Sequence, residues 1–509
     1  MSTSSRIIKN TSFLYLKMGI TMFVSLLTTR LLLNSLGVSD FGIYNIVGGA
    51  ISMLGFLNVA MASATQRFLS YSEGANDKDK ETIIFNASVI LHFIIAIIIS
   101  VALILACPFL FDSVLNIQAD RIEAAKIIYY SLIISTAFTM MTVPYDAVMN
   151  AHENMLYYSI IGVVESLLKL IVAIIVVYTL MDKLIIYGIL MSIIPFVTLT
   201  VMSIYCKRNY KECHFNYSLY FRKDTMKEMT SFAGWNFLSS FSSIVGNYSN
   251  GIVLNHFFGT VLNAALGVAN QLSGQLCAFS QNMMKAINPV IVKSEGAGCT
   301  EDMMTYSYAA CRYSYLLILF FAVPFAFQAP YILKIWLKNV PEWGILFFRF
   351  QLLRNLLEQL TGSLGTAIGA KGKIRGKSIS SILCNLIQIP ILYMIFKQGG
   401  TPAWYFIVIL ITMVLLSAMF NVYFCKKTCG MKLITYFRNV LVSCLSITIV
   451  MMLLSCIVLL LFKDGFLRTM LCFIITSLAF VVLFRFFASK EELMAINAMR
   501  IKIKNRLYK

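Results

Sequence analysis

Charged residues are scarce in this 509-residue chain, at 13%, whereas hydrophobic residues make up 59% of it. A soluble protein of this size needs far more polar surface. Apolar stretches of about 20 residues or more recur along the whole sequence instead, and about 20 helical residues cross a bilayer core. Because lipid offers the backbone no hydrogen-bond partner, the spanning element must be a helix. We therefore predict an all-α polytopic membrane protein.

The sequence also lacks the patterns of enzymes and metal proteins. Its twelve cysteines are scattered without a Cys-x-x-Cys pair, and its four histidines form no constellation. Cys206, Cys213 and His214 have no fourth ligand in view, so we interpret the cysteines as buried thiols. We predict no catalytic residue, no metal site and no cofactor, and leave open whether H⁺ or Na⁺ is a coupling ion.

Two short strings imitate phosphate-handling motifs without their context. Residues 372–378 (Gly-Lys-Ile-Arg-Gly-Lys-Ser) resemble a P-loop, but that motif needs a glycine where Lys371 stands and a strand before it. Asp77-Lys78-Asp79 has the form of a metal-holding motif of sugar-nucleotide transferases, yet no soluble catalytic domain surrounds it. We interpret both strings as polar loops.

The layout of residues 11–74 returns later in the chain. Three separated landmarks recur at one constant offset along the sequence: Gly37 with Gly259, Ser72-Glu73-Gly74 with Ser294-Glu295-Gly296, and Pro108 with Pro330. Thr11-Ser12-Phe13 is echoed by Thr230-Ser231-Phe232. An offset kept across distant landmarks indicates an internal duplication.

The apolar stretches predict fourteen membrane-spanning helices. They are 10–36, 40–71, 81–109, 122–150, 155–180, 183–206, 226–256, 259–290, 302–328, 344–369, 375–397, 402–425, 438–462 and 466–488. With the N-terminus inside, inner segments carry roughly three times as many lysines and arginines as outer segments. Both termini are therefore predicted to be cytoplasmic, and the net charge of +19 needs no nucleic-acid partner to explain it.

The duplication then has a geometry. Its two halves start on the same side of the membrane, so they are predicted to be parallel repeats related by an axis along the membrane normal. We expect a V-shaped bundle of two lobes with a cleft between them. The predicted parts are an N-lobe at 1–206, a cytoplasmic linker at 207–225, a C-lobe at 226–425, two extra helices at 426–488 and a basic cytoplasmic tail at 489–509.

Ionisable residues inside the spans are costly unless they pair or face water. Two pairs are four residues apart and predict intramembrane ion pairs: Glu165 with Lys169, and Arg354 with Glu358. Four cations have no such local partner: Lys17, Arg67, Lys285 and, as a weaker candidate, Arg30. We predict that they form a cationic cleft for a phosphate-bearing ligand, with snorkelling to lipid headgroups as the alternative.

The seventh and eighth predicted helices are rich in amides. Among these are Asn247, Asn250, Asn270, Gln271 and Asn282. Hydrogen bonding between helices explains some of them. Their concentration favours a water-lined cavity wall that suits sugars.

The stretch 30–44 (Arg-Leu-Leu-Leu-Asn-Ser-Leu-Gly-Val-Ser-Asp-Phe-Gly-Ile-Tyr) resembles the opening signature of bacterial polysaccharide-export flippases of the Wzx type. These belong to the multidrug/oligosaccharidyl-lipid/polysaccharide (MOP) exporter superfamily. The repeated Ser-Glu-Gly and the string 330–336 (Pro-Tyr-Ile-Leu-Lys-Ile-Trp) resemble that family too. The resemblance implies a MATE-like fold. It also implies a flippase that moves an undecaprenyl-diphosphate-linked oligosaccharide, an O-antigen or capsular or exopolysaccharide repeat unit, to the outer leaflet of the bacterial cytoplasmic (inner) membrane.

Two transporter alternatives stay open. A MATE-type multidrug/cation antiporter should have a carboxylate-rich cavity, and a lipid II flippase should have a cationic one. A polysaccharide polymerase or ligase should carry a large periplasmic loop, which the sequence lacks, so we predict no enzyme. Expected partners are the lipid-linked oligosaccharide, membrane lipids and other polysaccharide-assembly proteins, with no nucleic acid and a monomeric state.

Overall fold

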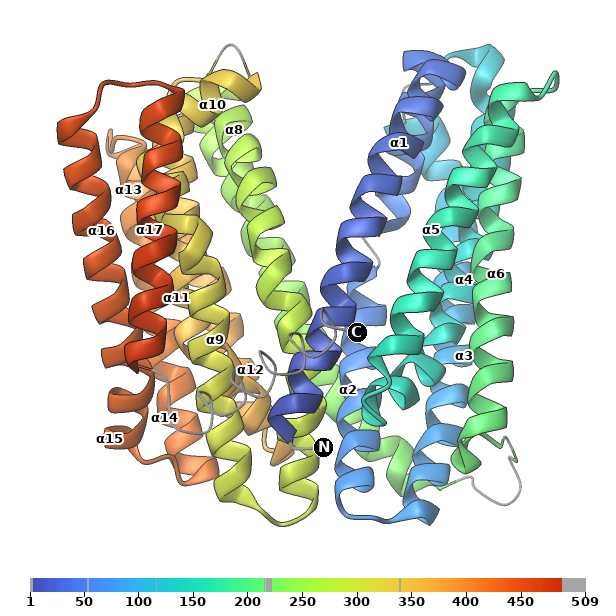
Figure 1. Ribbon diagram of the computed structural model, residues 1–509. Coiled ribbons are helices and arrows are strands. Elements are labelled where there is room, and N and C mark those ends of the chain that lie inside the picture. The colour runs from blue at the N-terminus through green and yellow to red at the C-terminus, as the bar shows by residue number, and fades with distance from the viewer. Residues whose placement is uncertain are drawn as a thin grey trace, which may run out of the picture. The chain divides into compact units, whose positions relative to one another are not determined.

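The structure, a computed structural model, describes residues 3–52, 55–115, 117–214, 216, 222–337 and 340–487. All regular elements within these ranges are helical (Figure 1). The long and short α-helices are α1 (Thr3–Ser52), α2 (Gly55–Gly74), α3 (Lys78–Phe109), α4 (Ile122–Ala151), α5 (Met155–Tyr178), α6 (Lys183–Asn209), α8 (Lys223–Gly296), α9 (Thr300–Phe327), α10 (Ala329–Leu337), α11 (Gly344–Ala370), α12 (Arg375–Lys397), α13 (Ala403–Ile409), α14 (Ser417–Cys429), α15 (Leu433–Tyr436), α16 (Ser443–Leu461) and α17 (Phe466–Phe487). Short 3₁₀ or π turns are η1 (Leu110–Val114), η2 (Ala119–Arg121), η3 (Lys211–Cys213), η4 (Leu410–Leu416) and η5 (Phe437–Val442). The predicted tail at 489–509 lies outside the described residues.

The chain divides into two units. The N-terminal unit comprises Asn10–Ser240 with Gly296–Gly298, and the C-terminal unit comprises Met1–Lys9, Phe241–Glu295 and Cys299–Lys509. Because the division falls inside α8, this one helix contributes to both units. The predicted division around a linker at 207–225 stays a prediction.

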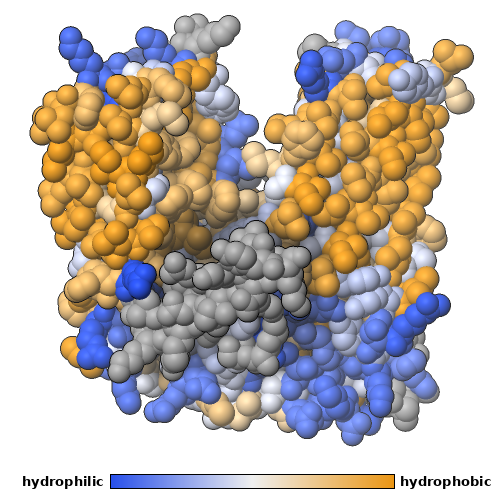
Figure 2. Space-filling view, viewed as in Figure 1, coloured by the Kyte–Doolittle hydropathy of each residue, from blue (hydrophilic) through white to orange (hydrophobic). Residues whose placement is uncertain are grey.

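Eleven helices of the described chain are long and apolar enough to cross a membrane. The predicted number of fourteen is compatible with this. The 74-residue α8 covers two predicted spans, and the predicted spans at 40–71 and 344–369 are not among the eleven. Figure 2 shows hydrophobic side chains over the outward surface of each unit, with hydrophilic residues toward the ends. The protein is therefore a multi-pass, all-helical membrane protein.

Two glycines bend the longest helices in the same way. Gly37 has φ 77° and ψ 172° inside α1, and Gly259 has φ 79° and ψ −174° inside α8. A positive φ strains residues that carry a β-carbon, so glycine is the residue that allows both bends. These two glycines are landmarks of the duplication, so the repeated sequence landmark is also a repeated backbone conformation.

The turns between helices repeat as well. Asn76 follows α2 with φ 55°, and Gly298 follows α8 with φ 78°, at the same offset that relates Gly37 to Gly259. Glu153 follows α4 with φ 55°, and Gly372 follows α11 with φ 75°, at a slightly shorter offset. The duplication therefore extends through the helix ends as well as the spans.

Each unit has one central helix packed among the others. In the N-terminal unit α4 packs against α2, α3 and α6, and its fully buried Tyr129 donates a hydrogen bond to the Leu103 carbonyl at 2.7 Å. In the C-terminal unit α9 packs against α11, α16 and α17, and its buried Tyr315 hydroxyl lies 2.8 Å from Thr448 Oγ1. These buried contacts join neighbouring helices within each unit.

Candidate functional site

Lys17 lies on α1 and crosses the surface of α5. Its ammonium nitrogen is 4.0 Å from the centre of the Tyr158 ring. A β-carbon at Gly162 would lie only 2.2 Å from Lys17 Cε, so the lysine stem occupies the space that this glycine leaves. An aromatic face attracts a cation without neutralising it. Lys17 can therefore still attract an anion.

Arg67 of α2 is held in a similar way by three rings. Its guanidinium carbon lies 4.5 Å from the centre of Phe68, 5.1 Å from Tyr71 and 5.5 Å from Phe232. The planar guanidinium suits both stacking on rings and two-point recognition of phosphate. Lys17 and Arg67, two of the three predicted cations in the N-terminal unit, are thus both set against aromatic rings.

The other two predicted cations differ in exposure. Arg30 is exposed on α1, and Lys285 is partly buried on α8 within the C-terminal unit. That Lys17, Arg67, Lys285 and Arg30 line one cleft stays a prediction from the sequence.

The amides predicted to form a cavity wall fall into two groups: some bond to helix atoms, and others are exposed. Asn250 is buried and its side-chain nitrogen lies 3.3 Å from Gln388 Oε1 of α12, so it joins helices where the sequence predicted a cavity wall. A β-carbon at Gly246 would lie 2.6 Å from the Asn385 carbonyl oxygen, which shows how closely α8 and α12 approach. Asn282 donates to the Ala278 carbonyl of its own helix at 3.0 Å.

Three of the amides are exposed on α8: Asn247, Asn270 and Gln271. Asn270 accepts a 2.5 Å hydrogen bond from Gln351 of α11. An amide facing hydrocarbon would lose its hydrogen bonds to water, so exposed amides on a membrane helix favour contact with water or a polar ligand. Their role as a cavity wall stays a prediction.

The two predicted ion pairs have short contacts in the structure. Lys169 Nζ lies 2.6 Å from Glu165 Oε1 on α5, and Arg354 Nε lies 2.8 Å from Glu358 Oε1 on α11. Each pair neutralises itself within one helix. We therefore assign them no part in ligand binding.

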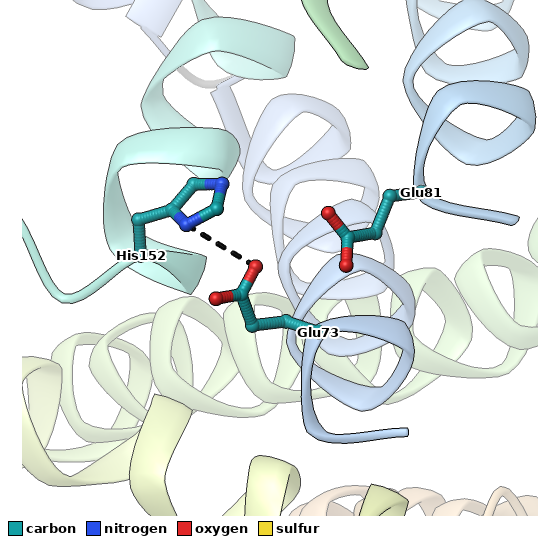
Figure 3. A group of neighbouring side chains, drawn as sticks. All are labelled: Glu73, Glu81 and His152. Carbon is teal, nitrogen blue, oxygen red and sulfur yellow. Dashed lines mark ion pairs between the residues drawn. The ribbon is translucent and has the colours of Figure 1, made fainter. Parts of the chain in front are cut away.

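A group of ionisable residues gathers where α2 ends, α3 begins and α4 ends. We call Glu73, Lys78, Glu81, His152 and Glu212 the N-terminal cluster. His152 Nδ1 lies 3.1 Å from Glu73 Oε2, and His152 Nε2 lies 2.5 Å from Glu212 Oε1 of η3. Figure 3 shows the side chains of Glu73, Glu81 and His152 converging from three helix ends. Because both ring nitrogens meet carboxylates, both donate, and the ring is an imidazolium.

Lys78 neutralises the other side of the cluster. Its ammonium lies 2.9 Å from Glu81 Oε1 and 3.4 Å from Glu73 Oε2. Glu81 is almost fully buried, with 1% of its side chain exposed, whereas 57% of the Lys78 side chain is exposed. A carboxylate so deeply buried needs a cation beside it.

Aromatic and amide groups hold the histidine in place. The Tyr210 ring stacks on His152 with centres 4.3 Å apart. Asn154 donates to the hydroxyls of Tyr205 at 2.7 Å and Tyr210 at 2.9 Å, and its oxygen caps α5. The turn from α4 to α5 therefore aims the imidazole at its two carboxylates.

The two carboxylates change the protonation of the ring. Burial opposes the charged form, but hydrogen bonds to Glu212 and Glu73 outweigh it and raise the pKa of His152 to about 9. The pKa of Glu212 is lowered, since the hydrogen bond from His152 outweighs the effect of burial. At neutral pH the histidine is therefore a stable cation.

The C-terminal unit has a simpler group at the corresponding helix ends. We call Glu295, Thr300 and Lys371 the C-terminal cluster. Lys371 Nζ lies 2.5 Å from Glu295 Oε1 and 2.9 Å from Thr300 Oγ1, which in turn donates to Glu295 at 3.0 Å. One carboxylate, one ammonium and one hydroxyl satisfy each other here.

The repeat relates the two clusters residue by residue. The offset between Gly37 and Gly259 also relates Glu73 to Glu295, Lys78 to Thr300 and Glu81 to Met303. The offset between Glu153 and Gly372 also relates His152 to Lys371 and Glu212 to Met431. Met303 and Met431 are buried. The N-terminal unit thus has two buried carboxylates where the C-terminal unit has two buried methionines.

Sequence reasoning missed the N-terminal cluster. It treated the four histidines as unrelated because Glu73, His152 and Glu212 are far apart in the chain. The repeat could have indicated this cluster. Glu73 and Glu295 are equivalent acids in the two repeats, and a cation is expected beside each of them. His152 and Lys371 stand at matching positions, just after α4 and α11.

A second ion network lies at other helix ends of the N-terminal unit. Arg121 Nη1 lies 2.6 Å from Asp182 Oδ2, and Arg121 Nε donates to Asp40 Oδ1 at 2.9 Å. Asp182 also caps α6. Through Asp40 and Asp182, Arg121 joins the second half of α1 to the starts of α4 and α6. We interpret this network as structural.

Residues 7–295, more than half of the chain, match the family described as polysaccharide biosynthesis protein. The chain belongs to this family. No curated protein matches it. Among solved structures it is similar to a proline-to-alanine mutant of MATE, with a TM-score of 0.73 and 16% identity over 84% of this chain and 99% of that one.

Two further solved structures have the same fold. One is an outward-facing multidrug resistance MATE family transporter of the MOP superfamily, with a TM-score of 0.71, 16% identity, and coverage of 84% of this chain and 99% of that one. The other is a MOP superfamily transporter from Pyrococcus furiosus, described as having a binding pocket of reverse polarity, with a TM-score of 0.72, 15% identity, and coverage of 84% and 96%. The chain is therefore a polysaccharide biosynthesis family protein with the fold of the solved MATE structures.

Proposed function

We propose that this protein is a flippase for a polyprenyl-diphosphate-linked oligosaccharide, with undecaprenyl as the expected lipid. It carries a repeat unit of O-antigen, capsule or exopolysaccharide from the inner to the outer leaflet of the bacterial cytoplasmic membrane. One observation supports this proposal most strongly: the chain matches the polysaccharide biosynthesis family and also has the fold of solved MATE structures.

The proposed substrate has two parts with opposite needs. The diphosphate and sugars are strongly disfavoured in hydrocarbon. The long isoprenoid gains nothing by leaving the bilayer, because it is already out of water. A membrane protein that moves the headgroup alone must therefore offer it cations and hydrogen-bonding groups within the spanning region.

The N-terminal unit supplies cations of the required kind. Lys17 lies over the Tyr158 ring, and Arg67 lies among the rings of Phe68, Tyr71 and Phe232. We propose that both contact the diphosphate, with Lys285 and Arg30 as further contacts. The exposed amides Asn247, Asn270 and Gln271 are proposed to meet the glycan.

The rest of the proposal follows from this activity. The protein is proposed to act without covalent chemistry, to place both termini in the cytoplasm, and to work as a monomer beside other polysaccharide-assembly proteins. Its ligands are lipid-linked oligosaccharide and membrane lipids, with no nucleic acid. A drug/cation antiporter shares this fold, so the experiment below includes it as an outcome.

The proposal is tested with purified protein in vesicles that contain a fluorescent polyprenyl-diphosphate oligosaccharide. Lys17→Glu and Arg67→Glu should each lower the rate of headgroup translocation by at least tenfold, because a charged contact contributes about 1.5–3 kcal/mol and becomes repulsive on reversal. Lys463→Glu makes the same charge change at an exposed loop position and should leave the rate unchanged.

Two results would refute the proposal. One is translocation at the wild-type rate in the Lys17→Glu/Arg67→Glu double variant. The other is vesicles that exchange a cationic drug for protons but leave the labelled glycolipid in its original leaflet, which would assign the antiporter function instead.

A further inference from the structure

The N-terminal cluster has more buried acid than the fold requires. The C-terminal cluster closes the same helix ends with Glu295, Thr300 and Lys371, and with methionines in place of Glu81 and Glu212. Burying a carboxylate costs free energy unless a cation compensates it. The N-terminal cluster instead brings three carboxylates and an imidazole together, and these are groups that bind divalent metal ions. This donor set makes this end of the unit a candidate cation site.

Ligand atoms from three residues of the cluster lie close together. One carboxylate oxygen each of Glu73 and Glu81 and one ring nitrogen of His152 all lie within 4.8 Å of one another. Ligand atoms of a transition metal lie about 2.0–2.2 Å from it, so opposite ligands are roughly 4 Å apart. A small contraction therefore brings all three residues to a metal ion, and Figure 3 shows their side chains directed inward.

Glu212 contributes the second feature of a metal site. A histidine that binds a metal through one nitrogen commonly donates its other N–H to a carboxylate, which fixes the ring and its tautomer. Glu212 Oε1 lies 2.5 Å from His152 Nε2, so the ring is oriented with Nδ1 toward Glu73. Stacking on Tyr210 holds the ring plane. Among the described residues the C-terminal cluster has no counterpart, since it has Lys371 in place of the histidine and Met431 offers no carboxylate to accept such a bond.

Lys78 occupies the cation position in the metal-free chain. Its ammonium contacts both Glu81 and Glu73, the two carboxylate ligands. More than half of its side chain is exposed, and a lysine stem is flexible, so it can turn out to water when a metal ion enters. At the matching position the C-terminal cluster has Thr300, which permits no such exchange.

We propose that Glu73, Glu81 and His152 bind one divalent transition-metal ion. On binding, His152 releases its Nδ1 proton to water and the Lys78 ammonium moves out, and both changes reverse when the metal leaves. Two carboxylates and one imidazole suit Mn²⁺, Co²⁺ or Zn²⁺ better than Cu⁺ or Ca²⁺. The ion joins the ends of α2, α3 and α4, and through Glu212 it fixes η3. This site is separate from the residues proposed to bind diphosphate, and it stands whether or not the flippase function does.

The test measures metal binding by the purified full chain in detergent, with any affinity tag removed. Co²⁺ titration followed by visible absorption should reveal one saturable site per chain, and Zn²⁺ should displace the Co²⁺. Lys78→Met should tighten Co²⁺ binding by about tenfold, because the competing ammonium is gone. Glu81→Met should weaken it by at least tenfold, and Glu212→Met by 10- to 100-fold, the range typical of outer-shell partners.

The repeat supplies the controls for this test. Glu295→Gln in the C-terminal cluster should leave Co²⁺ affinity unchanged. Glu81→Met installs the residue that the C-terminal unit carries at Met303, so it should fold, and thermal unfolding checks this. The proposal is overturned if wild type and Lys78→Met both lack saturable Co²⁺ binding up to millimolar concentration. It is equally overturned if Glu81→Met binds Co²⁺ as wild type does.

Discussion

The N-terminal and C-terminal clusters solve one structural problem with different chemistry. In both, an acid at the end of one helix contacts a base just after another: Glu73 with His152, and Glu295 with Lys371. The C-terminal cluster is electrically balanced. The N-terminal cluster adds the buried carboxylates Glu81 and Glu212 and has histidine in place of lysine, so it contains a base that titrates at lower pH than lysine does.

This difference separates the charged groups that the fold requires from those that it does not require. One carboxylate and one cation are sufficient to close the helix ends, as the C-terminal unit shows. The additional buried carboxylates of the N-terminal unit therefore call for a role beyond closure. The variants below either break one cluster or make it resemble the other.

The largest effect is expected from His152→Ala. It removes the cation that contacts Glu212 and leaves Lys78 as the remaining base of a cluster with three mostly buried carboxylates. Loss of one partner from a buried ionic network costs about 3–5 kcal/mol. Thermal unfolding in detergent with a chelator should show the loss, whereas His152→Lys, which copies the C-terminal cluster, should restore most of it. Equal stability of His152→Ala and wild type would contradict the ionic assignment.

Alkaline pH should weaken the N-terminal cluster in metal-free protein. The pKa of His152 is raised from 6.5 to about 9, so its stabilisation is fully present below about 6.5, declines above that and is lost above about 9. Loss of the charge frees η3, which exposes the buried neighbour Cys213. Thiol labelling of Cys213, mapped by mass spectrometry, should therefore rise near pH 9 in wild type.

The matched variant for this pH test is His152→Lys. Lysine titrates above about pH 10, so at pH 9 its Cys213 should label more slowly than that of wild type. Identical labelling of both proteins at pH 9 would show that the imidazolium does not hold η3.

Glu295→Gln should have a smaller effect than His152→Ala. Lys371 then loses its carboxylate, but a quarter of its side chain is exposed and Thr300 remains as a partner. We expect a loss of about 1–2 kcal/mol, the scale of one charged hydrogen bond that water partly replaces. A loss as large as that of His152→Ala would show that the two clusters are energetically alike.

The smallest change in stability is expected from Gly162→Ala. The new methyl group displaces the flexible end of Lys17, so stability should change by less than about 1 kcal/mol, while glycolipid translocation falls several-fold. Gly365→Ala is the matched control, because Lys377 of the C-terminal unit crosses Gly365 in the same way. Equal loss of translocation in both variants would show that the position of Lys17 has no special importance.

Much of the architecture could be predicted without coordinates. Apolar stretches indicated the helical membrane class, because hydrocarbon leaves the backbone few choices. Gly37 and Gly259 are a repeated landmark in the sequence, and each lies at a bend in its helix. Such a bend is detectable from sequence because a positive φ strongly favours glycine. Local pairs such as Glu165 with Lys169 could also be predicted, because four-residue spacing on a helix is a local property.

The sequence by itself determined that this protein is a helical, duplicated membrane protein with ionisable side chains inside its spans. Only the tertiary structure decided the partners of residues far apart in the chain. It set Lys17 over Tyr158, placed Asn250 against Gln388 and joined Glu73, His152 and Glu212. The physical reason is that helix formation depends on neighbouring residues, whereas these contacts depend on how whole helices pack.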